Sequence, residues 1–399
     1  MTDKKYVVYL GCPGFPYGLA EMQKIILISK SLVFSGNHVT VINNQARHTE
    51  KVHPDLQAHG NYQDIEYIYT SGEQFYNASF LKRNVSKFKG FINEFRFLKE
   101  RKKKNQLDVA IISTHSFNAV LYYRILSRLI GFKIVLNYVE FYSGLKKKWS
   151  KIGTTVKDEL FDRYAPPLSD GILPISEFLI NHLNKVAPDK PYLKIPGLTE
   201  FERYNGIEKK EGEEYFLFCG AASYREVIEF VIDSYCQLKN SSVHLYVVTN
   251  GSAEAINGIK EYANSKEQKN NIQFFSKLSE RDLFTKYKNA VALLIPLRNT
   301  FQDIARFPHK FGEYLGSNNP VITTNYGEVR KYFRDKQNML VAETYDVDQY
   351  AEKMQFVLDN PEEAKRIGLE GTKTALPLFD YKAKAPEIDE FMALMKNKR

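Results

Sequence analysis

Residues 307–324 read FPHKFGEYLGSNNPVITT and carry the strongest indication of the fold. It follows a continuously apolar run at 291–297 (VALLIPL), which is typical of a parallel strand covered by helices on both faces. Pro308 can begin a helix, Gly316 to Asn319 can end it, and residues 321–323 predict the next strand. The segment therefore predicts part of an open α/β sheet, which binds ligands where the carboxyl ends of its strands meet.

Lys310 and Glu313 stand three residues apart on this predicted helix, so they share one side of its first turns. An ammonium group there can meet a diphosphate, and a carboxylate can accept hydrogen bonds from both hydroxyls of a ribose. The pairing of these two side chains indicates a binding site for a sugar nucleotide. The alternative is an ordinary intrahelical ion pair, worth only about 0.2–0.5 kcal/mol.

The pattern F-P-x-K-x-x-E-Y-L-x-x-x-x-P-V-I resembles the nucleotide-binding signature of retaining glycosyltransferases of the GT-B fold, in glycosyltransferase family 4 (group 1). The resemblance implies two Rossmann-like, doubly wound parallel-sheet domains that face a central cleft. It also implies metal-independent transfer, with retention, from a nucleotide-diphosphate sugar (a UDP-sugar) to a glycan or lipid-linked acceptor. Glu313 would bind the nucleotide ribose.

Strand and helix signals alternate along both halves of the chain, as in doubly wound sheets. We expect an acceptor-binding domain at 1–200, a nucleotide-sugar-binding domain at 201–380, and a final helix within 381–399 (386–396) that returns to the first domain. The domain boundary lies in 193–213, where Pro196, Gly197 and EKKEGEE interrupt the pattern. Strands are predicted at 6–11, 38–43, 108–113, 133–138, 171–175, 215–220, 243–249, 272–275, 291–297 and 321–323. Helices are predicted at 19–35, 118–129, 156–163, 227–239, 254–265, 280–288 and 310–315.

In the first half, the candidate site residues follow predicted strands. The loop GCPGFPYG (11–18) lacks G-x-G-x-x-G, so a nicotinamide enzyme is not expected. The resemblance implies that Tyr17 and Gly18 approach donor and acceptor, Gly18 because it has no side chain; the alternative is a simple tight turn. His115 is the catalytic candidate, in contact with the transferred sugar. Glu140 and Tyr142 are acceptor candidates, with a capping or surface role as the alternative.

In the second half, the segment YFLFCGAASYREVIEF matches a strand, glycine, loop and helix of the resembled family. The resemblance assigns donor binding to Gly220, to Arg225, whose guanidinium suits a diphosphate, and to Lys277. One residue departs from the family pattern: Ala305 stands where those enzymes often carry a first glutamate. Gln302 or Asp303 is the possible substitute.

Charge is concentrated in the first half, with 28 Lys/Arg against 18 Asp/Glu in residues 1–200 and 28 against 29 in the remainder. Ten basic residues lie between Lys82 and Lys104, around a helical-period apolar stripe that we expect to be core. The basic face suits an anionic membrane surface. Nucleic acid is not expected, because no binding motif accompanies the charge. The stripe consists of Phe88, Phe91, Ile92, Phe95 and Leu98.

The remaining sequence features concern the cellular location of the protein and its cofactors. Three cysteines without C-x-x-C spacing indicate neither a disulfide framework nor a zinc site, and favour a cytoplasmic protein. The basic segment from Lys82 to Lys104 favours a peripheral position on the inner face of a membrane. No signal peptide and no membrane span are expected. Asp346 and Asp348 form D-x-D but open a probable helix, so no metal is assigned. Two other functions remain open: a non-catalytic partner of an active transferase, and a sugar-nucleotide 2-epimerase.

Overall fold

A computed structural model describes residues 4–12, 14–18, 20–144, 152–210, 212–239 and 242–398, and only the backbone of residues 20 and 152–155. The chain divides into two compact units. Unit 1 contains Met1–Leu198 together with Tyr381–Arg399, and unit 2 contains Thr199–Asp380. The division falls within two residues of the boundaries proposed from the sequence, and the C-terminal segment belongs to unit 1.

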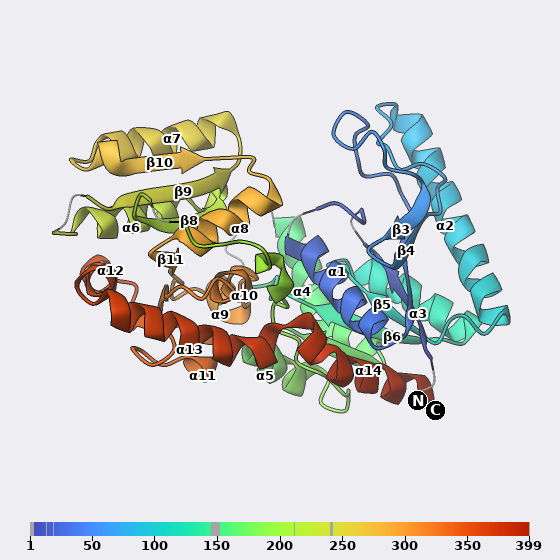
Figure 1. The fold of residues 1–399 in the computed structure, drawn as a ribbon. Coiled ribbons are helices and arrows are strands. Elements are labelled where there is room, and N and C mark those ends of the chain that lie inside the picture. Colours follow the sequence, from blue (N-terminus) through green and yellow to red (C-terminus); the bar gives the residue numbers. More distant parts are fainter. Residues whose placement is uncertain are drawn as a thin grey trace. The chain divides into compact units, whose positions relative to one another are not determined.

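Unit 1 is built on a seven-stranded sheet in the order β3-β4-β2-β1-β5-β6-β7 (Figure 1). All neighbouring strands pair in parallel except β3 and β4, which are antiparallel. The carboxyl ends of β1 and β5 are adjacent, and strand order reverses there, which is where open α/β sheets bind ligands. The strands are β1 (Tyr6–Leu10), β2 (His38–Asn43), β3 (His59–Tyr62), β4 (Ile65–Tyr69), β5 (Val109–Ile112), β6 (Lys133–Tyr138) and β7 (Gly171–Pro174).

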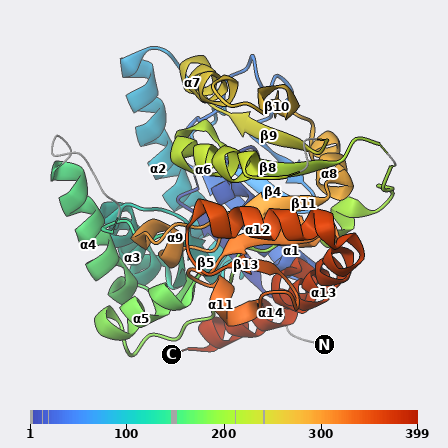
Figure 2. The same cartoon turned by 90° about the vertical axis from the view of Figure 1, so that its left-hand side faces the viewer.

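Helices cover both faces of this sheet. Figure 2 shows α2, α3 and α4 on one side of it and α1 and α14 on the other. Helices α1 and α14 pack on the sheet around one hydrophobic core, which includes the fully buried residues Tyr9, Ile25 and Met392. The helices are α1 (Ala20–Phe34), α2 (Phe80–Lys103), α3 (Phe117–Ile130), α4 (Ile152–Leu168), α5 (Glu177–Val186) and α14 (Tyr381–Asn397).

Helix α2 corrects one prediction. Phe88 and Ile92 are exposed and not in the core, and only Leu98 of the predicted stripe is fully buried. Phe91 and Phe95 are half-buried. The buried line of α2 is instead Ser86, Gly90, Glu94 and Leu98. Gly90 is the cause, because a Cβ there would lie 1.9 Å from the backbone oxygen of Asn44, so only glycine lets the helix approach the end of β2.

Unit 2 is built on a six-stranded parallel sheet in the order β10-β9-β8-β11-β12-β13. Strands β8, β9 and β10 follow one another toward one edge of the sheet, and β11, β12 and β13 follow one another toward the other edge. The strand order therefore reverses between β8 and β11, as in dinucleotide-binding sheets. The strands are β8 (Tyr215–Ala221), β9 (His244–Asn250), β10 (Ile272–Phe275), β11 (Ala292–Ile295), β12 (Val321–Thr324) and β13 (Leu340–Ala342).

The helices of unit 2 bury an apolar core against this sheet. Figure 2 shows α6 and α12 lying across one face, and their residues Ile228, Tyr350 and Met354 are fully buried in one cluster with the strands. The sequence therefore predicted the class correctly: both units are doubly wound α/β sheets. The helices are α6 (Arg225–Cys236), α7 (Ala253–Asn264), α8 (Glu280–Asn289), α9 (Phe301–Ala305), α10 (Lys310–Leu315), α11 (Val329–Tyr332), α12 (Val347–Asp359) and α13 (Pro361–Phe379).

Most predicted elements are present, with ends that differ from the prediction by no more than five residues. Strands β2, β6 and β10 and helix α10 have the predicted bounds. Helix α14 begins earlier than predicted, at Tyr381, so Pro386 lies inside it and not at its start. Leu19, where the first helix was predicted to begin, lies outside the described residues. The sequence analysis missed β3, β4, β13, α5, α9, α11 and α13.

Candidate functional site

The ion pair of Lys310 and Glu313 is the centre of the site in unit 2. Both residues lie on α10, which follows the carboxyl end of β11 and precedes β12. Nζ of Lys310 donates a hydrogen bond to Oε2 of Glu313 at 2.8 Å and another to the Tyr287 hydroxyl at 2.9 Å. The Glu313 side chain is 8% exposed and the Lys310 side chain 31%. The carboxylate is therefore shielded while the ammonium group keeps access to solvent.

The charges around Glu313 keep it ionised. Burial alone would raise the pKa of Glu313, but the charges of Lys310 and His309 outweigh burial and hold that pKa below its ordinary value. Burial likewise opposes the charge on Lys310, and Glu313 raises the pKa of Lys310 despite it. Oε1 of Glu313 lies 3.8 Å from Nε2 of His309, beyond hydrogen-bond distance. The site thus presents a fixed carboxylate, which is an acceptor for hydroxyl donors.

Neighbouring tyrosines and one glycine fix the position of α10. The Tyr204 hydroxyl donates to the backbone oxygen of Glu313, and the Tyr314 hydroxyl accepts from the backbone N–H of Cys219 on β8 at 2.9 Å. A Cβ at Gly312 would lie 2.9 Å from Cβ of Thr199, so the glycine permits this close packing. The first turn of α10 is held rigidly against the central strand of the sheet.

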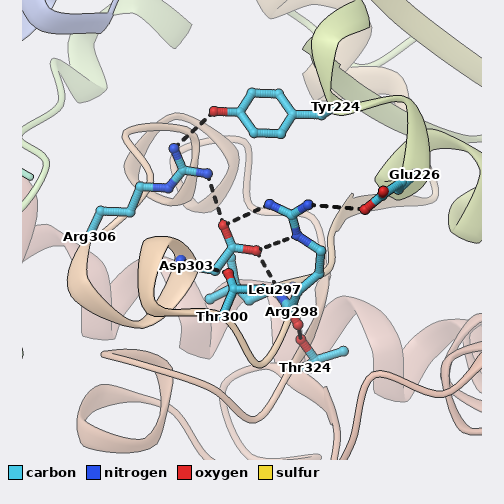
Figure 3. A network of polar contacts seen from close by, with 8 residues as sticks. All are labelled: Tyr224, Glu226, Leu297, Arg298, Thr300, Asp303, Arg306 and Thr324. Atoms are coloured by element: carbon cyan, nitrogen blue, oxygen red, sulfur yellow. Dashed lines mark hydrogen bonds and ion pairs between the residues drawn. The ribbon is translucent and has the colours of Figure 1, made fainter. Parts of the chain in front are cut away.

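A second polar cluster lies beside the point where strand order reverses, between β11 and α10 (Figure 3). Asp303 is 3% exposed and accepts hydrogen bonds from Nε of Arg298 at 2.8 Å and from Nη2 of Arg306 at 2.9 Å. Nη1 of Arg306 donates to the Tyr224 hydroxyl at 2.9 Å, and Thr300 caps α9 by accepting from the Asp303 N–H. One buried carboxylate thereby orients two guanidinium groups.

Electrostatics explain why Asp303 stays charged in a buried position. Burial alone would raise its pKa, but hydrogen bonds from Arg298 and the charge of Arg306 hold that pKa below its ordinary value. The side chains of Arg298 and Arg306 are 18% and 22% exposed. Nη1 of Arg298 also lies 3.6 Å from Oε2 of Glu226, whose side chain is 85% exposed (Figure 3). The two guanidinium groups thus face one buried and one solvent-exposed carboxylate, and guanidinium groups of this kind suit an anionic partner. The sequence analysis did not identify either arginine.

Ala305, the position of the missing glutamate, is completely buried. Asp303, one of the two possible substitutes, is engaged with both arginines. Gln302 is half-buried on α9. The structure therefore gives Asp303 the role of orienting Arg298 and Arg306.

The other donor candidates of unit 2 lie near the carboxyl ends of different strands. Gly220 is on β8, where a Cβ would lie 2.8 Å from the ring of Phe218. Arg225 pairs with Glu229 on its own helix at 2.6 Å and packs beside Gly258 of α7. The backbone N–H of Lys277, which is exposed, donates to the Asn250 side chain at 3.0 Å, at the end of β9.

The candidates at the first loop of unit 1 follow β1. Tyr17 is 39% exposed, and its ring stacks on His53 with centroids 4.0 Å apart. Gly18 is exposed, and a Cβ there would lie 2.8 Å from Cβ of Met22 in the first turns of α1. Gly11, with φ of +74°, makes the turn directly after β1. Glycine is therefore required for the course of this loop.

The remaining candidates of unit 1 follow β5 and β6. His115 is exposed between β5 and α3, and its ring lies 5.7 Å from that of Tyr142, centroid to centroid. Tyr142 also packs edge-on against Phe161 of α4. Burial is the main factor that raises the pKa of Tyr142, with Glu21 and Glu140 adding to it. The structure thus brings His115, Glu140 and Tyr142 to the carboxyl edge of the unit 1 sheet.

Asp346, from the D-x-D pattern, caps α12: its side chain accepts from the Gln349 N–H at 3.0 Å. Across the described ranges, no three His, Cys, Asp or Glu side chains gather as ligands for a metal ion. Within the same part of the chain, no helix has the length and apolarity needed to cross a bilayer.

Two comparisons of the sequence with known proteins find glycosyltransferases. The family model described as "Glycosyl transferases group 1" matches residues 201–374, which make up most of unit 2. An uncharacterized glycosyltransferase of Methanocaldococcus jannaschii is 23% identical over 218 residues. The match covers 54% of this chain and 58% of that protein, so it spans less than two thirds of the relative.

Solved structures resemble the whole chain. Sucrose-phosphate synthase from Thermosynechococcus elongatus has a TM-score of 0.74 at 15% identity, over 98% of this chain and 99% of its own. A glycosyltransferase from Rickettsia africae has a TM-score of 0.72 at 15% identity, over 99% and 100%. HepE of Anabaena, in complex with UDP and glucose, has a TM-score of 0.67 at 12% identity, over 99% and 100%. These likenesses confirm the predicted GT-B fold.

Proposed function

We propose that the protein is a glycosyl transferase of group 1, the family whose model matches residues 201–374, and that it transfers a sugar, with retention, from a nucleotide-diphosphate sugar to a glycan or lipid-linked acceptor. We take the donor to be a UDP-sugar. The likeness in fold to HepE, which was solved with UDP and with UDP-glucose, supports this choice. The free cysteines Cys12, Cys219 and Cys236 support a cytoplasmic location.

The observation that carries the proposal is the shielded Lys310–Glu313 pair after β11. An ordinary surface pair would place both charges in water and would leave the pKa of each group close to normal. Here the Glu313 carboxylate is nearly buried, held by α10 and ionised. A carboxylate of this kind can accept hydrogen bonds from both hydroxyls of a ribose. The ammonium group of Lys310, which keeps access to solvent, can contact the phosphates.

The diphosphate of the donor would meet fixed positive charge. Arg298 and Arg306 are oriented by Asp303 beside the β8–β11 reversal point, and guanidinium groups bind phosphate oxygens in bidentate fashion. Such charges stabilise a leaving diphosphate without a metal ion. We therefore propose metal-independent transfer, and activity should persist in excess EDTA.

In the proposed reaction, the bond between the anomeric carbon and the diphosphate oxygen breaks, and a bond to an acceptor hydroxyl oxygen forms. The acceptor hydroxyl loses its proton, and the nucleoside diphosphate leaves. We assign contact with the transferred sugar to His115, and contact with the acceptor to Glu140 and Tyr142, because these side chains gather at one edge of the unit 1 sheet.

Nucleotide binding tests the donor site. Calorimetry with UDP, GDP and ADP should find saturable binding of one nucleotide, UDP, to the wild-type protein. Glu313→Gln and Lys310→Met should each weaken it at least tenfold. Glu370→Gln is the matched control, because Glu370 pairs with Lys373 at the same i,i+3 spacing but in solvent. Wild-type protein that binds none of the three nucleotides would refute the donor assignment.

The alanine at position 305, where the resembled enzymes often carry a glutamate, favours one alternative, a GT-B protein that binds nucleotide but does not transfer sugar. Mass analysis after incubation with a UDP-sugar and membrane extract separates the possibilities. A transferase releases UDP and adds a hexose mass to an acceptor, and a 2-epimerase changes the sugar nucleotide itself. A non-catalytic partner leaves the sugar nucleotide intact while binding UDP.

A further inference from the structure

A cavity of about 280 Å³ lies in unit 1 between the first turns of α2 and two loops. One loop, at 45–47, follows β2, and the other, at 73–77, follows β4. Strands β2 and β4 pair in parallel, so both loops leave the carboxyl edge of the sheet, where open α/β sheets bind ligands. One water molecule needs roughly 10–15 Å³ of such space, so the cavity has room for an oxyanion and the group that carries it.

Positive charge predominates among the side chains that line this cavity. Three of them are cations, Arg47, Arg83 and Lys87, and one is acidic, Glu73. Guanidinium and ammonium groups form stronger hydrogen bonds to phosphate and carboxylate oxygens than neutral donors do. Amide side chains, which can donate to and accept from hydroxyl groups, complete much of the polar lining. These amides are Gln45, Asn77 and Asn84.

Arg83 is held in place by aromatic side chains and not by a carboxylate. Its Nη1 donates to the Tyr76 hydroxyl at 2.6 Å, and its guanidinium lies 4.9 Å from the centroid of the Tyr76 ring. The centroid of the Phe80 ring lies 5.6 Å from the same guanidinium. In the part of the chain that the structure describes, Arg47, Arg83 and Lys87 form no ion pair with a carboxylate. Their charges are therefore available to an anionic ligand.

Ser86 adds a buried hydroxyl group to the cavity. The residue is 9% exposed, lines the cavity and belongs to the buried line of α2. Within the described ranges, its Oγ has no hydrogen-bond partner. Arg83 precedes Ser86 by three residues and Lys87 follows it, so the three side chains fall within about 100° of one face of the helix. A buried hydroxyl without a partner is costly, and an oxygen of a ligand between these cations would satisfy it.

The cavity adjoins the loop at 11–18, to which the sequence assigned contact with donor and acceptor. A Cβ at Gly14 would lie 2.8 Å from Cβ of Arg47, and Nε2 of His48 lies 3.0 Å from the backbone oxygen of Gly14. The partly exposed ring of Tyr17 meets the ring of His48 edge-on, with centroids 5.9 Å apart. A ligand in the cavity would therefore lie beside the loop that carries Tyr17.

We propose that this cavity binds the anionic group of the acceptor, and that the acceptor is a carbohydrate with a phosphoryl or carboxylate group. The inference rests on the proposed transfer function and narrows the acceptor from any glycan to an acidic one. Arg83 and Lys87 bind the oxyanion, Ser86 donates its hydroxyl hydrogen to it, and Arg47 holds the ligand beside the loop at 11–18. The cavity belongs to unit 1 and the donor residues of α10 to unit 2, so the two sites can be tested separately.

Calorimetry with small sugars and the full chain tests the cavity. In phosphate-free buffer at fixed ionic strength, glucose 6-phosphate supplies a phosphoryl group, glucuronate supplies a carboxylate, and glucose supplies neither. At least one anionic sugar should bind about tenfold or more tightly than glucose, because a charge-assisted hydrogen bond contributes about 1.5–3 kcal/mol. The sugar that binds identifies the anionic group of the acceptor.

Two charge variants separate the cavity from general attraction to a basic helix. Arg83→Gln/Lys87→Gln and Arg96→Gln/Lys99→Gln each remove two cations from α2, but only the first pair lines the cavity. The first pair should weaken binding of the anionic sugar about tenfold or more. The second pair should change it by about twofold or less, because exposed charges at a distance are screened by salt.

Ser86→Ala separates a ligand site from a structural cluster. Its Oγ has no partner among the described residues, so its loss should leave the midpoint of urea unfolding unchanged or higher. The same change should weaken binding of the anionic sugar about three- to tenfold, the value of one hydrogen bond. Ser29→Ala is the matched control, since Ser29 on α1 also has a buried hydroxyl without a partner within the described chain but does not line the cavity. It should leave sugar binding unchanged.

The proposal fails if neither anionic sugar binds more tightly than glucose, or if the two charge variants lose the same affinity. Inorganic phosphate that binds as tightly as glucose 6-phosphate would make the cavity a site for free phosphate and overturn the acceptor assignment. All four variants should keep the UDP affinity of the wild type. Sugar binding without UDP binding would refute the donor site alone, and UDP binding without sugar binding would refute the acceptor site alone.

Discussion

Nζ of Lys310 lies 2.8 Å from Oε2 of Glu313, and the same spacing recurs in unit 2 between Lys373 and Glu370 at 2.7 Å. The two pairs differ in their surroundings. The Lys373 and Glu370 side chains are 71% and 41% exposed, whereas that of Glu313 is 8% exposed. The two pairs have the same three-residue spacing, with the lysine first in one and the glutamate first in the other. Spacing does not tell a buried pair from a solvated one, and only the structure shows that Glu313 is shielded.

Glu313→Gln should therefore destabilise the protein where Glu370→Gln does not. At pH 7 the first change leaves Lys310 without its carboxylate. We expect the free energy of unfolding in urea to fall by about 1–3 kcal/mol, less than for a fully buried pair because Lys310 is about one third exposed. Glu370→Gln should change it by about 0.5 kcal/mol or less.

The fall in the free energy of unfolding caused by Glu313→Gln should depend on pH. The pKa of Glu313 is depressed in the folded state, so its contribution is present above the ordinary carboxyl value and is lost as pH falls through the folded pKa. The difference between wild type and Glu313→Gln should narrow below about pH 4. A difference that is constant from pH 7 to pH 3 would contradict an ionised Glu313.

Ionisation of Glu94 should affect stability in the opposite direction to that of Glu313. It is completely buried on α2, where it accepts from the Tyr123 hydroxyl at 3.2 Å, and burial raises its pKa to about 7 despite hydrogen bonds that favour the charged form. The folded state then binds more protons than the unfolded state between about pH 4.5 and 7, so wild-type stability falls as pH rises through this window. Glu94→Gln should be more stable than wild type at pH 8 by about 2–3 kcal/mol.

Chemical denaturation at pH 5 and pH 8 measures this effect. Glu100→Gln, on the same helix but exposed, is the control and should shift stability equally at both pH values. A stability of Glu94→Gln that follows wild type across the window would show that Glu94 titrates normally.

Lys24 supplies a buried cation. It lies on α1 at 4% exposure, its Nζ has no hydrogen-bond partner among the residues described, and burial lowers its pKa to about 7. The unfolded state binds more protons between about pH 7 and 10.5, so wild-type stability rises with pH across that range. Lys24→Met should stabilise the protein at pH 7 by about 3–5 kcal/mol, and the gain should vanish near pH 10.5. Lys30→Met, on the same helix, is the control and should change stability by about 1 kcal/mol or less, because the amine of Lys30 is only partly buried and lies over the ring of Tyr381.

The sequence predicted the bounds of several strands in different surroundings. Residues 133–138 form β6, a buried apolar run between helix signals. Residues 272–275 form β10 with the predicted bounds as well, although β10 is an edge strand in which only Ile272 is buried. The hairpin of β3 and β4 was missed. Its turn uses Gln63 and Asp64 at φ of +51° and +65°, not the Asn-Gly pair that marks such turns, and its first strand (HGNY) is polar.

The site was predictable only where its members are close in sequence. Lys310 and Glu313 lie on one helix, so spacing placed them together. Arg298 and Arg306 meet at Asp303 because the chain folds back between β11 and α10, and no periodicity encodes that return. The stripe of α2 was misplaced for a related reason. Hydrophobic periodicity identifies an amphipathic face but cannot tell whether Gly90 lets the opposite face pack closer.

The two arginines at Asp303 give the last prediction, which separates ribose recognition from phosphate recognition. Arg306→Gln should weaken UDP binding about ten- to a hundredfold, the value of a charge-assisted hydrogen bond to phosphate, and leave uridine binding unchanged. Glu313→Gln should weaken both ligands, because both contain the ribose. Arg225→Gln is the informative control, because Arg225 is 54% exposed and already paired with Glu229. Calorimetry with uridine and UDP on the three variants measures these differences. A UDP affinity that falls in Arg225→Gln and stays constant in Arg306→Gln would return the diphosphate to the residue first proposed from the sequence, and would leave Asp303 and its arginines as a purely structural cluster.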